Sequence, residues 1–183
     1  DDISMCLGRE KFLGGWEANS WQQHTANIVS LAFHPQNLWV VAGDQDGELT
    51  IWDVNSGELI KEISAHNGAV EAISVSHDGS RILTGGGDNI LHLWEVETGN
   101  KVRSFEDHTL KVRGVALLRS GHYMLSASAD ETVRFWNAAT GKCEMVYKGH
   151  QGQVLALSPS PDESSFLSAG EDGVLKLWKI GKA

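Results

Sequence analysis

The sequence predicts an all-β fold made of four consecutive repeats. Tryptophans recur every 42 residues, at Trp52, Trp94, Trp136 and Trp178. Histidines keep the same spacing, and so do aspartates placed six residues before each tryptophan. A period of about 40 residues is typical of arrays in which each repeat forms one supersecondary unit. Twenty glycines against three prolines agree with many tight turns and few rigid spacers.

Each repeat contains four short runs with the composition of β-strands. In the second repeat these are residues 69–76, 81–86, 90–96 and 101–106, which carry β-branched or alternating apolar residues. The segments between them, SHDG, GGDN and ETGN, have the composition of tight turns. No segment shows an apolar period of about 3.6 residues, so we expect little helix. Each repeat is therefore predicted to be a four-stranded antiparallel unit.

The repeats divide the chain into an N-terminal segment and four units of one domain. The expected ranges are 1–23 for the segment, and 24–65, 66–107, 108–149 and 150–183 for the repeats. The fourth repeat lacks its fourth strand, because the sequence stops soon after the third. Since an unpaired strand edge favours aggregation, we expect strand 174–180 to be paired. Residues 17–22 lie one period of 42 before the outer strand at 59–64, so the stretch around Leu13–Gln22 can serve as the closing strand.

These residues resemble the WD-repeat family of β-propellers. The strict GH dipeptide occurs at Gly149-His150 and the strict WD dipeptide at Trp52-Asp53, while the other repeats carry variants of both. The resemblance covers His24 to the end of the chain and implies a β-propeller of WD-repeat type, with four blades of four antiparallel strands in this chain. Because seven blades are usual in that family, we expect either a partial propeller or one completed by oligomerisation. Two chains in an eight-bladed ring, a closed four-bladed ring and an excerpt of a longer propeller stay open as alternatives.

Each repeat also contains a histidine and an aspartate, and three of the four repeats add a serine or threonine. These are the residue types of a nucleophilic triad. The resemblance implies a structural role instead, in which the aspartate orients the histidine, the histidine bonds the hydroxyl, and the hydroxyl accepts the indole N–H. An active site is rarely copied in every repeat, whereas a fully connected polar network avoids unsatisfied buried groups. The expected members are His24, Asp46, Trp52, His66, Thr84, Asp88, Trp94, His108, Ser126, Asp130, Trp136, His150, Ser168, Asp172 and Trp178. Ala42 stands at the hydroxyl position of the first repeat, so we expect the first blade to lack this bridge.

We expect no catalytic residue, no cofactor and no metal site. The glycine-rich stretch at 83–89 lacks the Lys-Ser/Thr sequel and the helix of a phosphate-binding loop. His34, His77 and His122 lie in turns where solvated side chains are expected, and His92 lies on an outward strand position. None has carboxylate or cysteine partners at metal-ligand spacing.

Charge and cysteine content limit the partners and the compartment. The net charge of −9 disfavours nucleic acid and anionic membrane surfaces as partners. The two cysteines, Cys6 and Cys143, have no CxxC or zinc-ligand spacing, which fits a reducing compartment. We therefore expect a cytoplasmic or nuclear protein.

The resemblance implies a docking platform, because rigid strands hold the loops of a propeller in fixed positions. We expect a non-catalytic protein–protein interaction scaffold that docks a protein or peptide partner within a multiprotein complex. The candidate partner-binding residues flank the repeated histidines and aspartates: Asn27, Asp44, Gln45, Glu71, Lys111, Arg113, Gln153 and Glu171. The alternatives are a self-assembling structural module, possible as a homodimer, and an enzyme with a propeller pocket, which would need a non-repeating acid, base or metal set.

Overall fold

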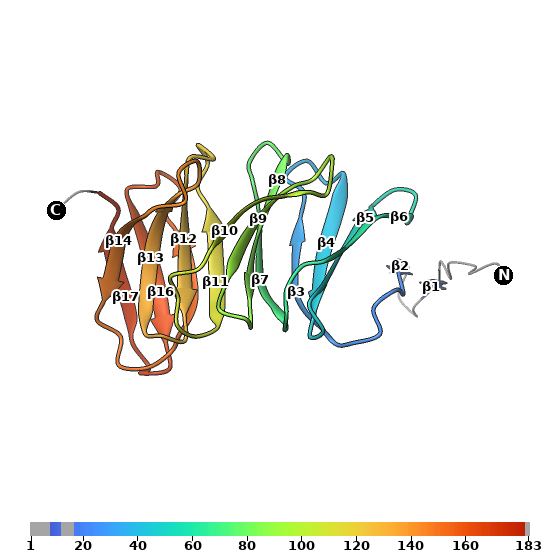
Figure 1. Cartoon of the computed structure of the whole chain (residues 1–183). Helices are drawn as coiled ribbons and strands as arrows, with labels where there is room; N and C mark the ends of the chain where they lie inside the picture. Colours follow the sequence, from blue (N-terminus) through green and yellow to red (C-terminus); the bar gives the residue numbers. More distant parts are fainter. Residues whose placement is uncertain (1–7, 12–16, 182–183) are drawn as a thin grey trace.

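The computed structural model describes residues 8–11 and 17–181, and every regular element within them is a β-strand (Figure 1). A two-stranded sheet of β1 (Gly8–Lys11) and β2 (Glu17–Ser20) precedes four antiparallel sheets, which we call blades 1 to 4. Blade 1 consists of β3 (Ile28–Phe33), β4 (Trp39–Asp44), β5 (Glu48–Asp53) and β6 (Leu59–Ser64). Blade 2 consists of β7 (Val70–Val75), β8 (Arg81–Gly86), β9 (Leu91–Glu95) and β10 (Lys101–Phe105).

Blades 3 and 4 repeat this order of strands. Blade 3 consists of β11 (Val112–Leu117), β12 (Tyr123–Ser128), β13 (Thr132–Asn137) and β14 (Cys143–Lys148). Blade 4 has three strands, β15 (Val154–Pro159), β16 (Ser165–Gly170) and β17 (Leu175–Lys179). In every blade each strand pairs with the next one along the chain, which is the meander that the spacing of turn residues predicts.

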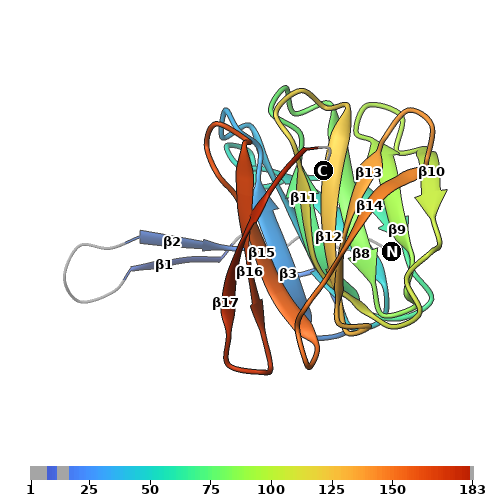
Figure 2. The same ribbon diagram turned by 90° about the vertical axis from the view of Figure 1, so that its left-hand side faces the viewer.

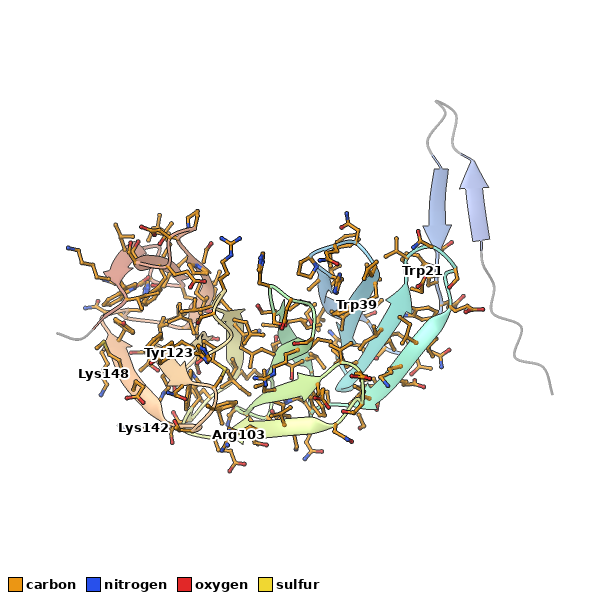
Figure 3. All side chains as sticks on the ribbon, turned by 90° about the horizontal axis from the view of Figure 1, so that it is seen from above. Trp21, Trp39, Arg103, Tyr123, Lys142 and Lys148 are labelled. Atoms are coloured by element: carbon orange, nitrogen blue, oxygen red, sulfur yellow. The ribbon has the colours of Figure 1, made fainter. Side chains whose placement is uncertain are left out.

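The blades stand side by side along an open arc (Figure 3). Their first strands, β3, β7, β11 and β15, are neighbours from blade to blade. The convex side of the arc carries Arg103, Lys142 and Lys148 (Figure 3). These residues belong to the last strand of a blade or to the turn before it. Blade 1 and blade 4 lie at opposite ends of the arc (Figure 1). The open sheets fit a partial propeller.

Apolar clusters between neighbouring blades form the core. Between blades 1 and 2, Val41 and Ile51 pack against Ile82 and Trp94, and all four are almost fully buried. Two further clusters join blade 2 to blade 3 and blade 3 to blade 4. Side chains alternate between the two faces of a strand, so the second and third strands of an inner blade reach both neighbours. Full burial stabilises each aliphatic side chain by roughly 1.5–3 kcal/mol, so stacking is what holds the array together.

A close approach between turns also locks blade 2 onto blade 1. Gly79 has φ of +72°, and a Cβ built on it would lie 1.8 Å from Nε2 of His34. His34 is buried and packs on Trp39 with ring centroids 4.8 Å apart. The expectation of a solvated His34 was wrong, because the neighbouring blade covers this turn.

Among the described residues, none of the predicted closing segment pairs with β17. Residues 17–20 pair with β1, with Gly8 opposite Ser20, and the two strands lie apart from the blades (Figure 2). On the other side of β17 the described part of the chain places no strand. The physical reason is distance, since the segment enters blade 1 while β17 belongs to the far end of the arc. Residues 13–16 lie outside the described residues, so the closing role of 13–22 stays a prediction.

Candidate functional site

Blade 2 shows how the repeated polar residues meet. His66 Nδ1 lies 2.9 Å from the Asp88 carboxylate, and His66 Nε2 lies 2.7 Å from Thr84 Oγ1. The indole Nε1–H of Trp94 donates to the same hydroxyl at 3.0 Å. The pattern is satisfied when Nδ1–H donates to the carboxylate and Nε2 accepts the Thr84 hydroxyl proton. The chain of bonds joins the turn before β7, the turn after β8 and both central strands of the blade.

Blades 3 and 4 contain the same network. In blade 3 the bonds join His108 to Asp130 and Ser126, at 2.7 Å each, and Trp136 to Ser126 at 2.8 Å. Blade 4 has the corresponding bonds at 2.9, 2.7 and 2.8 Å, among His150, Asp172, Ser168 and Trp178.

Electrostatics within the network favour the ionised aspartate. Burial raises the pKa of Asp130, but hydrogen bonds from His108 and Thr132 outweigh it and hold the pKa well below its usual value. A backbone amide of Gln151 and the His150 bond lower the pKa of Asp172 to about 2. The carboxylates of Asp130 and Asp172 are therefore charged at neutral pH and can orient His108 and His150.

Blade 1 builds the network from different residues. His24 Nδ1 bonds the carboxylate of Asp44 at 2.7 Å, and His24 Nε2 bonds Thr50 Oγ1 at 2.6 Å. Trp52 Nε1–H donates to Thr50 at 3.0 Å. The expected gap at Ala42 is therefore filled by the protein itself, and the structure leaves Asp46 exposed and outside the network.

The substitution has a simple geometric cause. Thr50 lies directly opposite Ala42 in the β4–β5 pair, so a hydroxyl on either strand reaches the same space. Asp44 occupies the repeat position of Gly86, where an added Cβ would lie 2.2 Å from both Asp88 and His66. The backbone at position 44 therefore lies next to the histidine, so the Asp44 side chain bonds His24 directly, whereas in blade 2 the carboxylate comes from Asp88, two residues further along the turn. The signal in the sequence was a threonine across the strand pair from the missing hydroxyl.

The hydroxyls of this network are poorly placed for nucleophilic catalysis. Thr50, Thr84, Ser126 and Ser168 are buried, with exposed fractions of 1% or less. Each already contacts a histidine and an indole N–H. A substrate cannot approach such a hydroxyl without opening the blade, so the arrangement can hold loops in place but offers no access to a reacting group.

Seven of the eight candidate partner-binding residues lie at least partly at the surface. Asn27 and Gln45 are exposed, and their side-chain amides contact each other at 3.4 Å. Gln153 is half-buried and Glu171 is exposed at the same end of blade 4. Asp44 differs, because it is 1% exposed and bound to His24. Asp44 is therefore a member of the network and is not available to a partner.

The remaining three candidates form an ion-pair group between blades 2 and 3. Glu71 of β7 accepts from Arg113 Nη1 of β11 at 2.9 Å and lies 3.5 Å from Lys111 Nζ. The Lys111 side chain is 52% exposed, whereas that of Glu71 is 14% exposed. These charges lie at the end of the sheets where the histidine and aspartate turns gather. We call this end, with its turns at 44–47, 86–90, 128–132 and 170–173, the histidine-turn face.

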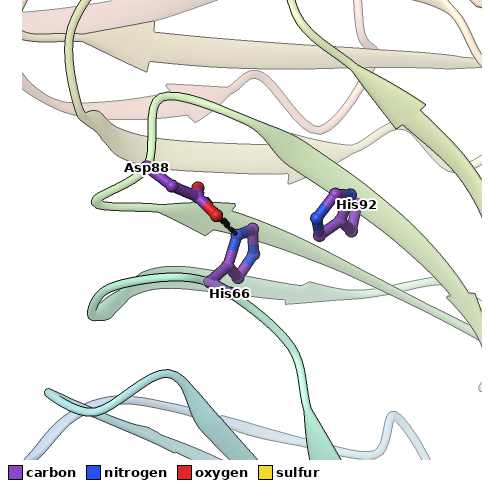
Figure 4. A group of neighbouring side chains, drawn as sticks. All are labelled: His66, Asp88 and His92. Carbon is purple, nitrogen blue, oxygen red and sulfur yellow. Dashed lines mark hydrogen bonds and ion pairs between the residues drawn. The ribbon is translucent and has the colours of Figure 1, made fainter.

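His92 lies inside blade 2 and not on an outward position as expected. It is 5% exposed and its ring stacks on that of His66, with centroids 4.6 Å apart and planes 16° apart (Figure 4). Its Nδ1 is buried and has no hydrogen-bond partner among the described residues. Burial, and to a lesser degree electrostatic interaction with His66 and Lys101, lowers the pKa of His92 to about 4, so the imidazole is neutral at pH 7.

Comparison with protein families gives a match along most of the chain. A family model described as "WD domain, G-beta repeat" matches residues 15–53, 57–95, 99–137 and 141–179. Each matched unit ends one residue after a repeated tryptophan, at the end of the third strand of a blade. The matched units therefore begin and end at other points than the blades do. None of the described residues forms a helix long and apolar enough to cross a membrane.

Named relatives match shorter parts of the chain. Autophagy-related protein 16 of Arabidopsis thaliana is 38% identical over 60 residues, which are 33% of this chain and 12% of that protein. The COMPASS component SWD3 of Saccharomyces cerevisiae is 38% identical over 61 residues, which are 33% of this chain and 19% of that protein. The chain thus spans less than a quarter of either relative.

Solved structures match the whole arc of blades. The crystal structure of the RRP9 WD40 repeats has a TM-score of 0.81 and 27% sequence identity, covering 87% of this chain and 50% of that one. A structure of U3-55K gives the same values. The four sheets therefore have the arrangement of about half of a larger array of such repeats.

Proposed function

The chain belongs to the WD40 repeat family, and on this premise we propose that it is a non-catalytic scaffold that docks protein or peptide partners within a multiprotein complex. Relatives support an assembly role by their names, which include a component of COMPASS, a small ribosomal subunit protein and a subunit of the target of rapamycin complex. The net charge of −9 supports protein over nucleic acid or membrane as the partner.

The observation that carries this proposal is the rigid support beneath the histidine-turn face. Four buried networks fix the turns, while polar side chains between them stay accessible. A surface held in this way loses little conformational entropy when a partner binds. We propose that the partner contacts the exposed or half-buried residues of this face: Asn27, Gln45, Glu71, Lys111, Arg113, Gln153 and Glu171.

The Glu71 group suggests which contacts carry the most specificity. Its carboxylate faces two cations from the next blade, and in the described part of the chain both cations share Glu71 as their ion-pair partner. Arg113 Nε is buried and has no hydrogen-bond partner in the described residues. A partner carboxylate or backbone carbonyl placed here would accept from the solvent-exposed donors of Lys111 and of the Arg113 guanidinium, while the buried Nε would stay inside. We propose an intracellular location, cytoplasmic or nuclear, on the basis of cysteine usage.

A pull-down with charge-reversal variants tests the docking face. The test protein carries E71K, K111E and R113E together, which makes the net charge more negative by about two units. The matched control carries E97K and K142E, which change exposed residues in turns at the opposite end of the sheets. We expect the first protein to lose its captured partners and the control to keep them. Equal capture by both proteins would contradict docking on the histidine-turn face.

A second candidate function, self-assembly, is favoured by the two open ends of the arc. Leu31 and Phe33 on blade 1 are 71% and 60% exposed, and Leu175 and Leu177 on blade 4 are 66% and 71% exposed. Contiguous exposed apolar groups of this kind mark interaction surfaces. On blade 1 a cavity of about 250 Å³ adjoins them, lined by apolar side chains that include Trp21 and Trp52.

The exposed apolar residues at the two ends of the arc correspond, by repeat position, to the two sets of residues that pack together between neighbouring blades. Leu167, Leu175 and Leu177 of blade 4 occupy the repeat positions at which blade 1 has Val41, Leu49 and Ile51. Leu31, Phe33 and Val40 of blade 1 occupy those at which blade 2 has Ile73, Val75 and Ile82. Those six residues pack together between blades 1 and 2. The surface of blade 4 therefore fits the outward surface of blade 1 of a second copy, which gives an eight-bladed ring.

Light scattering on the 183-residue chain tests self-assembly. We expect twice the 19.9 kDa of one chain, and a single-chain mass for the variant L31E/L177E. V146E, which changes an exposed apolar residue on the outer strand β14, serves as the control and should stay a dimer. A monomeric wild-type chain at every concentration would exclude this second function.

A further inference from the structure

One blade contains an additional imidazole beside its polar network. His92 occupies the repeat position of Thr50, Arg134 and Lys176, so in the described blades this second histidine is particular to blade 2. It lies on β9 opposite Thr84 of β8. Donor atoms of His66, Asp88 and His92 all lie within 4.8 Å of one another (Figure 4). Two imidazoles and a carboxylate are a donor set that suits zinc.

The unsatisfied nitrogen of His92 is the second observation that points to a ligand. A buried polar nitrogen without a partner destabilises the folded state, and a bound ion would remove that cost. The side chain is 95% shielded from solvent, since 5% of it is exposed. Its Nδ1 has no hydrogen bond to another described residue that would hold the ring in its present rotamer.

We infer that His66 Nδ1, the Asp88 carboxylate and a ring nitrogen of His92 form a zinc-binding site in blade 2. Tetrahedral zinc holds its ligands at about 2.0–2.2 Å. The Asp88 carboxylate must therefore move slightly away from His66 Nδ1, and the His92 ring must turn out of its nearly parallel stack on His66 so that one of its nitrogens points at the ion. The His66 ring keeps its place, because its Nε2 stays bonded to Thr84. Rotation of His92 breaks no hydrogen bond of its Nδ1, which has no partner among the described residues. Water takes the fourth position.

The surrounding hydrogen bonds can adapt to the ion without a net loss of protons. Zinc on Nδ1 of His66 moves the imidazole proton to Nε2, where Thr84 Oγ1 accepts it at 2.7 Å. The hydroxyl proton of Thr84 then turns to the carbonyl oxygen of His92, 3.4 Å away. Asp88 is held from outside by the backbone N–H of Asn67 at 3.0 Å. Outer-shell bonds of this kind orient metal ligands.

Calorimetric titration of the metal-free chain with zinc chloride tests this site. We expect one zinc ion per chain and, with cobalt(II) in place of zinc, the strong visible absorption of tetrahedral coordination. The variant H92T carries the residue that blade 1 has at this position, and H92Q is measured in parallel. Both should weaken zinc binding by at least about tenfold, the loss that even outer-shell changes typically cause. Circular dichroism verifies that each variant is folded.

The matched control removes two exposed histidines. The double variant H77Q/H122Q should bind zinc as tightly as the wild-type chain, since both side chains lie in turns at the surface. Absence of zinc binding by the wild-type chain would overturn the inference. So would wild-type affinity in a folded H92T or H92Q variant, or loss of binding in H77Q/H122Q, which would assign the ion to surface histidines.

Discussion

Thr50 lies opposite Ala42 in blade 1, and its hydroxyl takes the position that Thr84 fills in blade 2 from the neighbouring strand. The hydroxyl that joins the histidine to the tryptophan is thus present in both blades, but it comes from β5 in blade 1 and from β8, the second strand, in blade 2. The polar network therefore requires a hydroxyl at one point in space between the histidine and the tryptophan, and a residue on either of the two central strands can supply it.

Removing the Thr50 hydroxyl should destabilise blade 1. T50V keeps the shape but leaves His24 Nε2 and Trp52 Nε1 without their partner, so we expect a loss of about 2 kcal/mol in the free energy of unfolding. The second change A42S, which restores a hydroxyl on β4, should recover part of the loss. Urea denaturation measures both. Equal stability of T50V and the wild-type chain would show that the bridge is dispensable.

The two neighbouring aspartates of blade 1 should differ sharply. D44N removes the charge that His24 bonds at 2.7 Å inside the blade, and we expect it to lower the free energy of unfolding by about 2 kcal/mol. D46N changes an exposed side chain and should stay within about 0.5 kcal/mol of the wild type. The same denaturation assay compares them. A larger effect of D46N would restore the sequence-based assignment.

How far the sequence predicts this site can be judged from these two residues. The 42-residue period locates strands, turns and the networks of blades 2 to 4, because each uses the same residue types at the same offsets. Thr50, Asp44 and the burial of His92 depend on which side chains meet across a strand pair, and repeat alignment alone does not contain that information. The pairing of the free edge of β17 is a further matter, because no described strand lies beside that edge.

Acid should weaken blade 3 through Asp130. The pKa of Asp130 is lower in the folded protein than in the unfolded chain, so its stabilising contribution is present above about pH 4 and is lost as the pH falls further. D130N lacks this contribution, and we expect it to be less stable by about 2 kcal/mol at pH 7. Unfolding curves from pH 7 to about pH 2.5 should show the two proteins converging. A difference that is independent of pH would contradict this assignment.

Glycine at position 79 should be required for steric reasons, and position 121 provides the control. Both have positive φ, but a Cβ at Gly79 would strike His34 whereas Gly121 has nothing within 4 Å. We expect G121A to cost about 1 kcal/mol from backbone strain and G79A to cost clearly more. Thermal unfolding ranks the two variants. A G79A protein as stable as G121A would mean that blades 1 and 2 do not approach each other as described.

Hydrogen exchange in the presence of a captured partner tests the docking proposal most directly. The scaffold model predicts that protection increases at the histidine-turn face, in residues 44–47, 67–71, 109–113 and 151–155, and that exchange at the opposite turns around residues 55–58, 97–100 and 139–142 is unchanged. Protection confined to the opposite turns, or to the apolar ends of the arc, would contradict it.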